Sequence, residues 1–132
     1  MSRTLADIMA TELICFQTDT NIHTAIHVLL EKRISGAPVL DARGSLVGIL
    51  SKKDCLNVLF STAYHQDRGG PVEDYMSRDV QTLDAGLDLV AAAQYFLNSP
   101  FRRFPIMRDG QLVGQVSRHD IVNALAQDLK AG

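Results

Sequence analysis

An internal repeat constrains the fold of this chain more than any other feature of its sequence. Asp7-Ile8-Met9 is matched by Asp74-Tyr75-Met76, 67 positions later, and Pro38-Val39 is matched by Pro105-Ile106 at the same distance. A one-residue deletion then shortens the spacing to 66 positions. The further matches are Gly44, Leu46-Val47-Gly48, Ser51, Asp54, Asn57 and Leu59 with Gly110, Leu112-Val113-Gly114, Ser117, Asp120, Asn123 and Leu125. Two copies of one structural unit are therefore expected across nearly the whole chain.

The first copy carries the signals of a β-α-β-β-α order. A short apolar run at residues 14–16 predicts a strand, and Asp19 or Thr20 can cap a helix that ends near Arg33. The predicted apolar stripe of that helix is Ile22, Ala25, Ile26, Leu29 and Leu30. Apolar runs at residues 37–40 and 46–50 flank a turn-forming stretch at 41–44 and predict a hairpin. Ser51 can then cap a second helix that reaches Phe60.

The second copy repeats this order. We expect a strand near residues 80–82, a helix over 88–98, a hairpin that turns at Asp109-Gly110 and a helix that opens at Ser117. The polar stretch between the copies contains Gly69-Gly70-Pro71, which is typical of a connection. The predicted boundaries are therefore residues 1–61 for the first repeat, 62–71 for the linker and 72–132 for the second repeat.

Composition excludes several classes of partner. The formal net charge of −2 gives no broad positive field, so binding to nucleic acid or to an anionic membrane surface is not expected. No apolar run approaches the length of a bilayer span, and residues 1–10 lack the apolar core of a signal peptide. Cys15 and Cys55 lie in apolar stretches, which is typical of buried thiols in a reducing compartment. We therefore expect a soluble cytoplasmic protein.

The Gly-x-x-Ser-x-x-Asp element is the strongest candidate for ligand chemistry, and it occurs twice, as Gly48/Ser51/Asp54 and as Gly114/Ser117/Asp120. Each copy lies where a strand leads into a helix, so the hydroxyl and the carboxylate face the same side of the first turn. A carboxylate can accept both hydroxyls of a ribose diol. The same spacing also forms a capping box, in which the two side chains only close the helix end. The repeat alone does not separate these two interpretations.

Nothing in the sequence indicates catalysis. The chain has no GxSxG elbow and no GxxxxGK[ST] phosphate loop. His23 and His27 have the spacing of a metal pair, but no third ligand accompanies them, so a helix surface is the preferred interpretation. We expect neither an enzyme nor a metal site.

The repeated order of elements resembles the CBS domain family, named after cystathionine β-synthase. The residues that carry the resemblance are 34–39 with 46–54 in the first copy and 102–106 with 112–120 in the second, and it covers about residues 3–128. The resemblance implies an α/β (α+β) fold in which two β-α-β-β-α repeats pack about a pseudo-twofold axis as one module. It also implies a cleft between the repeats for an adenine nucleotide, with the Ser and Asp of the repeated element on ribose.

The resemblance further implies roles for the segment before the second hairpin. Arg102 and Arg103 stand where some members carry phosphate-binding residues, whereas the first copy has Ser35-Gly36 there, so the second copy is the expected site for a charged ligand. The alternative is that both arginines are solvated surface charges. Backbone groups around Phe104 and Pro105 would hold adenine. The full set of candidate ligand-binding residues is Ser117, Asp120, Arg102, Arg103, Phe104, Pro105, Arg118, Thr82, Ser51, Asp54, Gly36, Ala37 and Pro38.

These residues predict a stand-alone regulatory pair that binds AMP, ADP or ATP, requires no cofactor and signals to an unidentified regulated protein. The alternative is a ligand-free module for dimerisation and protein interaction. A homodimer is expected in both cases, because the second helices carry more apolar residues than one stripe needs. The residues concerned are Leu56, Val58, Leu59, Phe60, Ile121, Val122 and Leu125.

Overall fold

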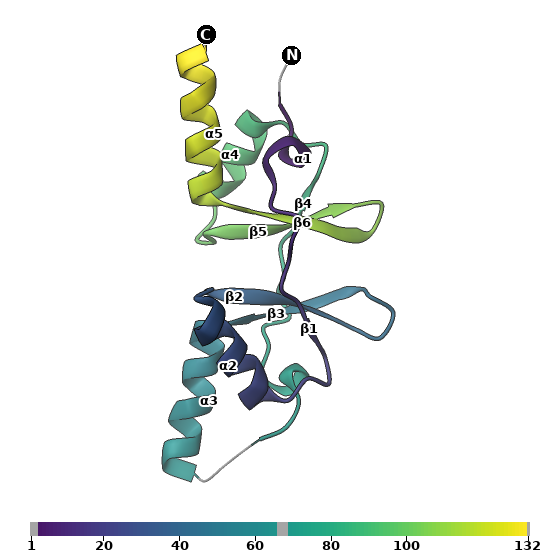
Figure 1. Cartoon of the computed structure of the whole chain (residues 1–132), viewed down its shortest axis with the longest axis vertical. Coiled ribbons are helices and arrows are strands. Elements are labelled where there is room, and N and C mark those ends of the chain that lie inside the picture. The colour runs from purple at the N-terminus through teal and green to yellow at the C-terminus, as the bar shows by residue number, and fades with distance from the viewer. Residues whose placement is uncertain (1–2, 66–68, 132) are drawn as a thin grey trace. The chain divides into compact units, whose positions relative to one another are not determined.

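The computed structural model describes residues 3–65 and 69–131, which divide into two compact units (Figure 1). One unit spans residues 14–80 and is called here the β1–β3 unit. The other combines the N-terminal segment up to residue 13 with the chain from residue 81 onward and is called the β4–β6 unit. Mixed helix and strand content, with one three-stranded sheet in each unit, confirms the predicted α+β fold class.

The β1–β3 unit consists of one sheet with helices packed against it. Its elements are β1 (Phe16–Gln17), α2 (Ile22–Lys32), β2 (Gly36–Leu40), β3 (Leu46–Ser51), α3 (Lys52–His65) and the short 3₁₀ helix η1 (Val72–Asp74). Strand β2 is central, because it pairs in parallel with β1 and antiparallel with β3. The hairpin turn predicted between β2 and β3 is confirmed. Gly44 adopts a φ of 82° there, and the Asp41 carboxylate accepts the N–H groups of Arg43 and Ser45 at 2.9 Å each.

The β4–β6 unit repeats the same plan. Its elements are α1 (Leu5–Ile8), β4 (Leu83–Asp84), α4 (Leu89–Leu97), β5 (Arg103–Arg108), β6 (Gln111–Ser117) and α5 (Arg118–Ala131). Strand β5 is central, parallel to β4 and antiparallel to β6. Asp88 caps α4 by accepting the N–H of Ala91, which confirms the predicted start of that helix. The core of this unit includes the edge-to-face rings of Phe96 and Phe104, whose centroids lie 4.8 Å apart.

The two Asp-x-Met segments each pack on the unit formed by the other copy of the repeat. Leu5 of the first segment is fully buried in the core of the β4–β6 unit, and Ala10 pairs with Gln115 of β6. Val72 and Met76 of the second segment lie in the core of the β1–β3 unit, and Ser77 pairs with Ile49 of β3. The compact units therefore differ from the sequence repeats. The boundaries at 1–61, 62–71 and 72–132 describe the repeat and stay a prediction.

Several predicted element ends are wrong by a few residues. The strand expected at 80–82 is β4 at 83–84, and β5 begins at Arg103, so that Arg103 is part of the strand and does not precede it. Helix α2 is capped by Asn21, whose side chain accepts the N–H groups of His23 and Thr24, and not by Asp19 or Thr20. Helix α3 continues past Phe60 to His65. Residues 66–68 of the expected linker lie outside the described part of the chain.

The end of α2 and its buried face agree with the predicted apolar stripe except at one position. The helix ends at Arg33, as expected, and this residue adopts a left-handed conformation; Ile22, Ala25, Ile26 and Leu29 are buried. Leu30 was expected in the same stripe but is 59% exposed. Among residues 3–65 and 69–131, no helix has both the length and the apolar composition that crossing a bilayer requires.

Candidate functional site

Each Gly-x-x-Ser-x-x-Asp element forms a reciprocal capping box at the start of the helix that follows the hairpin of its unit. In the β4–β6 unit the N–H of Ser117 donates to the Asp120 carboxylate at 2.8 Å, and the N–H of Asp120 donates to the Ser117 hydroxyl at 3.1 Å. Ser51 and Asp54 make the same two bonds at 2.9 and 3.1 Å in the β1–β3 unit. The capping interpretation is therefore confirmed for both copies. The carboxylate of a capping box uses only part of its acceptor capacity, so a contact with ribose stays compatible with it.

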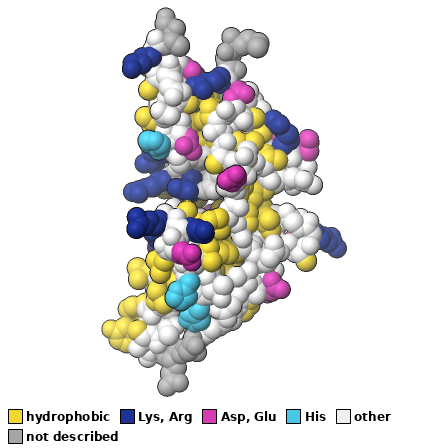
Figure 2. All heavy atoms as spheres, viewed as in Figure 1, with side chains coloured by type: hydrophobic (Ala, Val, Ile, Leu, Met, Phe, Trp, Pro, Cys, Tyr) yellow, Lys and Arg dark blue, Asp and Glu magenta, His cyan; other side chains and the backbone are white. Residues whose placement is uncertain are grey.

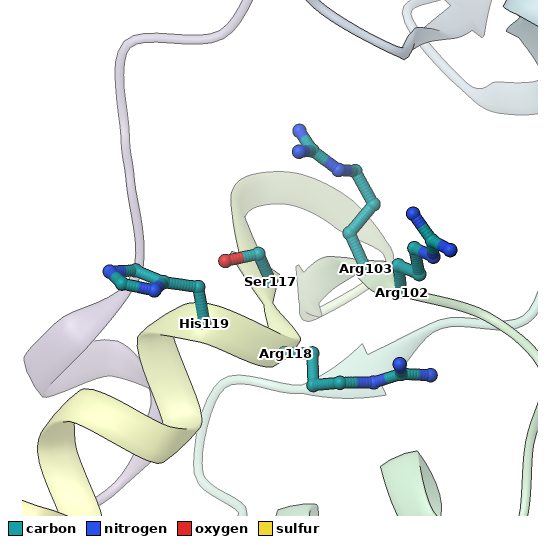
Figure 3. A pocket seen from close by; sticks show the side chains of 5 residues that line it. All are labelled: Arg102, Arg103, Ser117, Arg118 and His119. Atoms are coloured by element: carbon teal, nitrogen blue, oxygen red, sulfur yellow. The ribbon is translucent and has the colours of Figure 1, made fainter.

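The start of β5 lies beside the start of α5. The backbone N–H of Arg118 donates to the carbonyl of Arg102 at 2.7 Å, which holds the two segments together. A pocket of about 290 Å³ opens here, lined by Arg102, Arg103, Ser117, Arg118 and His119. In Figure 3 the side chains of Arg102 and Arg118 extend to one side of this junction and the imidazole of His119 to the other, with the Ser117 hydroxyl between them. Four of the predicted site residues thus share one pocket.

The electrostatics of this pocket favour an anion. Arg102, Arg103, Arg118 and His119 are all exposed, and among the ion pairs of the described residues none involves them. Figure 2 shows the corresponding concentration of Lys and Arg side chains on the visible face, at the level where β5 and α5 begin in Figure 1. Two of these groups lie in the first turn of a 14-residue helix, where the helix dipole disfavours cations unless an anion is close. Planar guanidinium groups bind phosphate oxygens in pairs, so phosphate is the anion they suit best.

The remaining predicted residues of the second copy do not line this pocket; they are Asp120, Phe104, Pro105 and Thr82. Phe104 and Pro105 are buried in β5, and the Phe104 ring stacks edge-on against Phe96 and Phe101. Their side chains belong to the core, so only their backbone could contact a ligand. Thr82 is exposed and directly precedes β4.

The predicted residues of the first copy form a junction without arginine. Gly36, Ala37 and Pro38 lie in β2, with Ala37 and Pro38 buried, and the N–H of Lys52 donates to the carbonyl of Ser35 at 2.9 Å. This bond corresponds to the one between Arg118 and Arg102. The β1–β3 unit therefore reproduces the backbone of the β4–β6 junction. It has Ser35 and Gly36 in place of the two arginines, whereas Lys52 and Lys53 begin α3 as Arg118 and His119 begin α5.

Sequence reasoning missed two residues of these junctions. His119 lines the pocket, and its position next to Arg118 in the first helical turn was the available signal. Ser77 donates its hydroxyl to the Asp54 carboxylate, with oxygen–oxygen distances of 3.2 and 3.3 Å. No sequence signal pointed to Ser77, because 23 residues separate the two partners.

The thiol next to Asp54 is poorly suited to nucleophilic chemistry. Burial raises the pKa of Cys55, and the negative charge of Asp54 raises it further. Burial also raises the pKa of Cys15. The thiolate is the reactive form, so both side chains stay protonated and unreactive near neutral pH. Both cysteines are free thiols, as expected; Cys55 is buried, as predicted, whereas Cys15 is only half-buried.

Known proteins share the sequence pattern and the fold of this chain. The sequence profile of the CBS domain matches residues 5–61 and 72–127. The crystal structure of CBSX2 from Arabidopsis thaliana in complex with AMP is similar, with 30% identity, a TM-score of 0.82, and coverage of 95% of this chain and 97% of that one. The CBS domain pair of protein MJ0100, in complex with 5′-methylthioadenosine and S-adenosyl-L-methionine, shares the fold at 22% identity and a TM-score of 0.78, over 97% of this chain and 99% of that one.

Curated relatives include much longer proteins. The A-adding tRNA nucleotidyltransferase of Aquifex aeolicus is 32% identical over 124 residues, which are 94% of this chain and 14% of that protein. An uncharacterised protein of Methanocaldococcus jannaschii is 28% identical over 122 residues, which are 92% of this chain and 42% of that protein. The chain thus spans less than half the length of either relative. Because both repeats match the family profile, the chain belongs to the CBS domain family.

Proposed function

We propose that this chain is a regulatory CBS pair that binds an adenosine-containing nucleotide of the AMP, ADP or ATP class and reports its level to a partner protein. The observation that carries the proposal is the pocket in which Ser117 meets Arg102, Arg103, Arg118 and His119. The pocket brings several cations together, and the capping box holds Asp120 beside its Ser117.

Each part of a nucleotide has a counterpart at this junction. The ribose diol donates to Asp120, whose carboxylate uses one oxygen to accept the Ser117 N–H. The phosphate is bound by Arg102 and Arg103, with Arg118 and His119 adding positive charge. Adenine lies against the backbone near Phe104 and Pro105, with Thr82 beside it. The AMP complex of CBSX2, whose crystallised chain matches this fold over 97% of its length, supports this choice of ligand.

Regulation without chemistry is the mode of action that these residues suit. The buried thiols are protonated, and the pocket offers cations and neutral hydrogen-bonding groups but no activated nucleophile. A ligand that binds one conformation more tightly than another shifts the population between them, and a partner protein then responds to that shift. We place this action in the cytoplasm.

Calorimetric titration with AMP, adenosine and GMP tests the proposal. We expect AMP to bind about tenfold more tightly than adenosine, because only AMP offers a phosphate to the arginines. AMP should also bind more tightly than GMP, since neutral backbone groups would recognise the adenine edge. Equal affinities for AMP and GMP would contradict the proposal. An absence of heat with AMP at millimolar concentration would favour the ligand-free interaction module instead.

An exposed apolar face on α3 supports a homodimer. Leu56, Leu59 and Phe60 are 66%, 45% and 60% exposed and lie at helical spacing, and Tyr64 continues the row with its ring 5.0 Å from that of Phe60. Figure 2 shows apolar side chains exposed on this side of the β1–β3 unit. On α5, Val122 and Leu129 are also exposed. Val58 and Ile121, by contrast, are buried within their own units.

Sedimentation at high micromolar concentration should show a dimer, and Phe60→Asp should convert it to a monomer with unchanged circular dichroism, because a charge would be placed in an apolar interface. Leu97→Asp is the control, since Leu97 is 84% exposed but lies on α4, outside the second helices. A wild-type monomer, or equal dissociation of both variants, would overturn the predicted interface.

A further inference from the structure

The two capping-box carboxylates differ in how fully they are hydrogen bonded. Asp54 accepts the Ser51 N–H and also the Ser77 hydroxyl. Asp120 accepts the Ser117 N–H, and its second oxygen accepts no hydrogen bond from any of the described residues. The carboxylate of the β4–β6 unit is thus open to a further donor, whereas that of the β1–β3 unit already holds one.

A single side chain accounts for this difference. Ser77 pairs with Ile49 of β3 through two backbone hydrogen bonds of 2.9 Å, which fix its hydroxyl next to Asp54. Ala10 pairs in the same way with Gln115 of β6, through two bonds of 3.0 Å. Positions 10 and 77 are equivalent in the repeat, so Ala10 stands where a hydroxyl would reach Asp120. The alanine side chain has no hydroxyl.

We propose that Ser77 restricts nucleoside binding to the β4–β6 unit, because its hydroxyl occupies the Asp54 carboxylate in the way that a ribose hydroxyl occupies Asp120. This inference rests on the proposed function and adds a residue that determines which of two similar junctions accepts the ligand. A ribose entering the β1–β3 unit has to displace a hydroxyl that the backbone holds in place. A ribose entering the β4–β6 unit displaces only water.

The charge of the two junctions agrees with this assignment. Arg102 and Arg103 line the pocket of the β4–β6 junction, and the β1–β3 junction has Ser35 and Gly36 in their place beside the lysines Lys52 and Lys53 of α3. If the hydroxyl is removed, the β1–β3 junction should accept a nucleoside, whose binding does not depend on the missing arginines. Adenosine is therefore the probe for that unit and AMP the probe for the other.

Ala10→Ser tests the inference in the β4–β6 unit. The new hydroxyl should donate to Asp120 and weaken AMP binding about three- to tenfold, as expected for competition by one hydrogen bond. Ala10→Cys, measured under reducing conditions, is the matched control, because a thiol of similar size is a weak donor and should leave the affinity within about twofold of wild type. Equal AMP affinity in wild type and Ala10→Ser would overturn the inference while leaving the proposed function intact.

Ser77→Ala tests it in the β1–β3 unit, in an Asp120→Asn background that weakens the other site. Adenosine should bind this double variant at least about threefold more tightly than Asp120→Asn alone. Unchanged adenosine binding would count against the role of Ser77. If wild type bound no AMP but Ser77→Ala bound adenosine, the proposed function of the β4–β6 pocket would fail, and with it the assignment of binding to that unit, whereas the closure of Asp54 by Ser77 would stand.

Discussion

Replacing Asp120 with Asn should weaken AMP binding about tenfold to a hundredfold, which corresponds to about 1.5 to 3 kcal/mol. The amide keeps one oxygen and can still accept the Ser117 N–H, so the helix cap persists. It loses the negative charge and half of the acceptor capacity that the ribose diol would use. Calorimetric titration of the variant measures this loss directly.

Asp54→Asn is the matched variant, because Asp54 makes the same capping box. Both replacements remove a charge from the first turn of a 14-residue helix and should lower the free energy of unfolding by less than about 1 kcal/mol. Only Asp120→Asn should change the AMP affinity. If the two variants lost stability alike and both bound AMP as wild type does, the carboxylates would be helix caps and nothing more. A loss of affinity confined to Asp54→Asn would move the site to the β1–β3 unit.

Local elements were predictable because short-range hydrogen bonds encode them. The Asp41 carboxylate accepts the N–H of Ser45, four residues later in the turn between β2 and β3. The Asp88 carboxylate accepts the N–H of Ala91, three residues later at the start of α4. The capping boxes are encoded in the same way, by a Ser and an Asp three residues apart. The resemblance between the two copies then supplied the fold class, since one pattern repeated in register predicts one unit repeated in space.

Element ends were less predictable where propensity and burial point in different directions. Helix α3 continues past Phe60 through residues 61–65, and the Thr62 hydroxyl donates back to the Val58 carbonyl at 2.9 Å. The stripe alone suggested an earlier end. Leu30 extended the apparent stripe of α2 by one position, but it lies next to Leu29 in the chain and so points about 100° away from it.

Local sequence pattern could not predict that each Asp-x-Met segment packs on the unit formed by the other repeat. Leu5 is buried in the unit that contains β4, about 80 residues later in the chain, and its N–H donates to the carbonyl of Leu87. Such a pairing depends on which sheet edge is free. The role proposed for Ser77 depends on the same packing, because its segment lies beside β3 only in the folded chain. The ligand-binding roles of the candidate residues stay predictions.

Gly114→Ala should destabilise the β4–β6 unit by about 2 kcal/mol, the usual cost of overpacking a buried site. Gly114 is buried in β6, and a Cβ atom there would lie 2.7 Å from Cγ of Met9 and 3.0 Å from the carbonyl oxygen of Ala10. The methionine can move, whereas the carbonyl is fixed by its bond from the Gln115 N–H. The first Asp-x-Met segment must therefore shift away from β6.

A double-mutant cycle with Met9→Ala, followed by chemical denaturation, distinguishes this contact from a general loss of stability. The double variant should be more stable than the sum of the two single effects predicts, because Met9→Ala removes the nearest clash, but it should not recover fully while the Ala10 carbonyl remains in place. Gly69→Ala is the control, since nothing lies within 4 Å of a Cβ atom there, and it should change stability by less than about 0.5 kcal/mol. Strictly additive effects of Gly114→Ala and Met9→Ala would show that the methionine does not pack against this glycine. That outcome would also remove the packing reason for the Asp-x-Met segment to lie on β6.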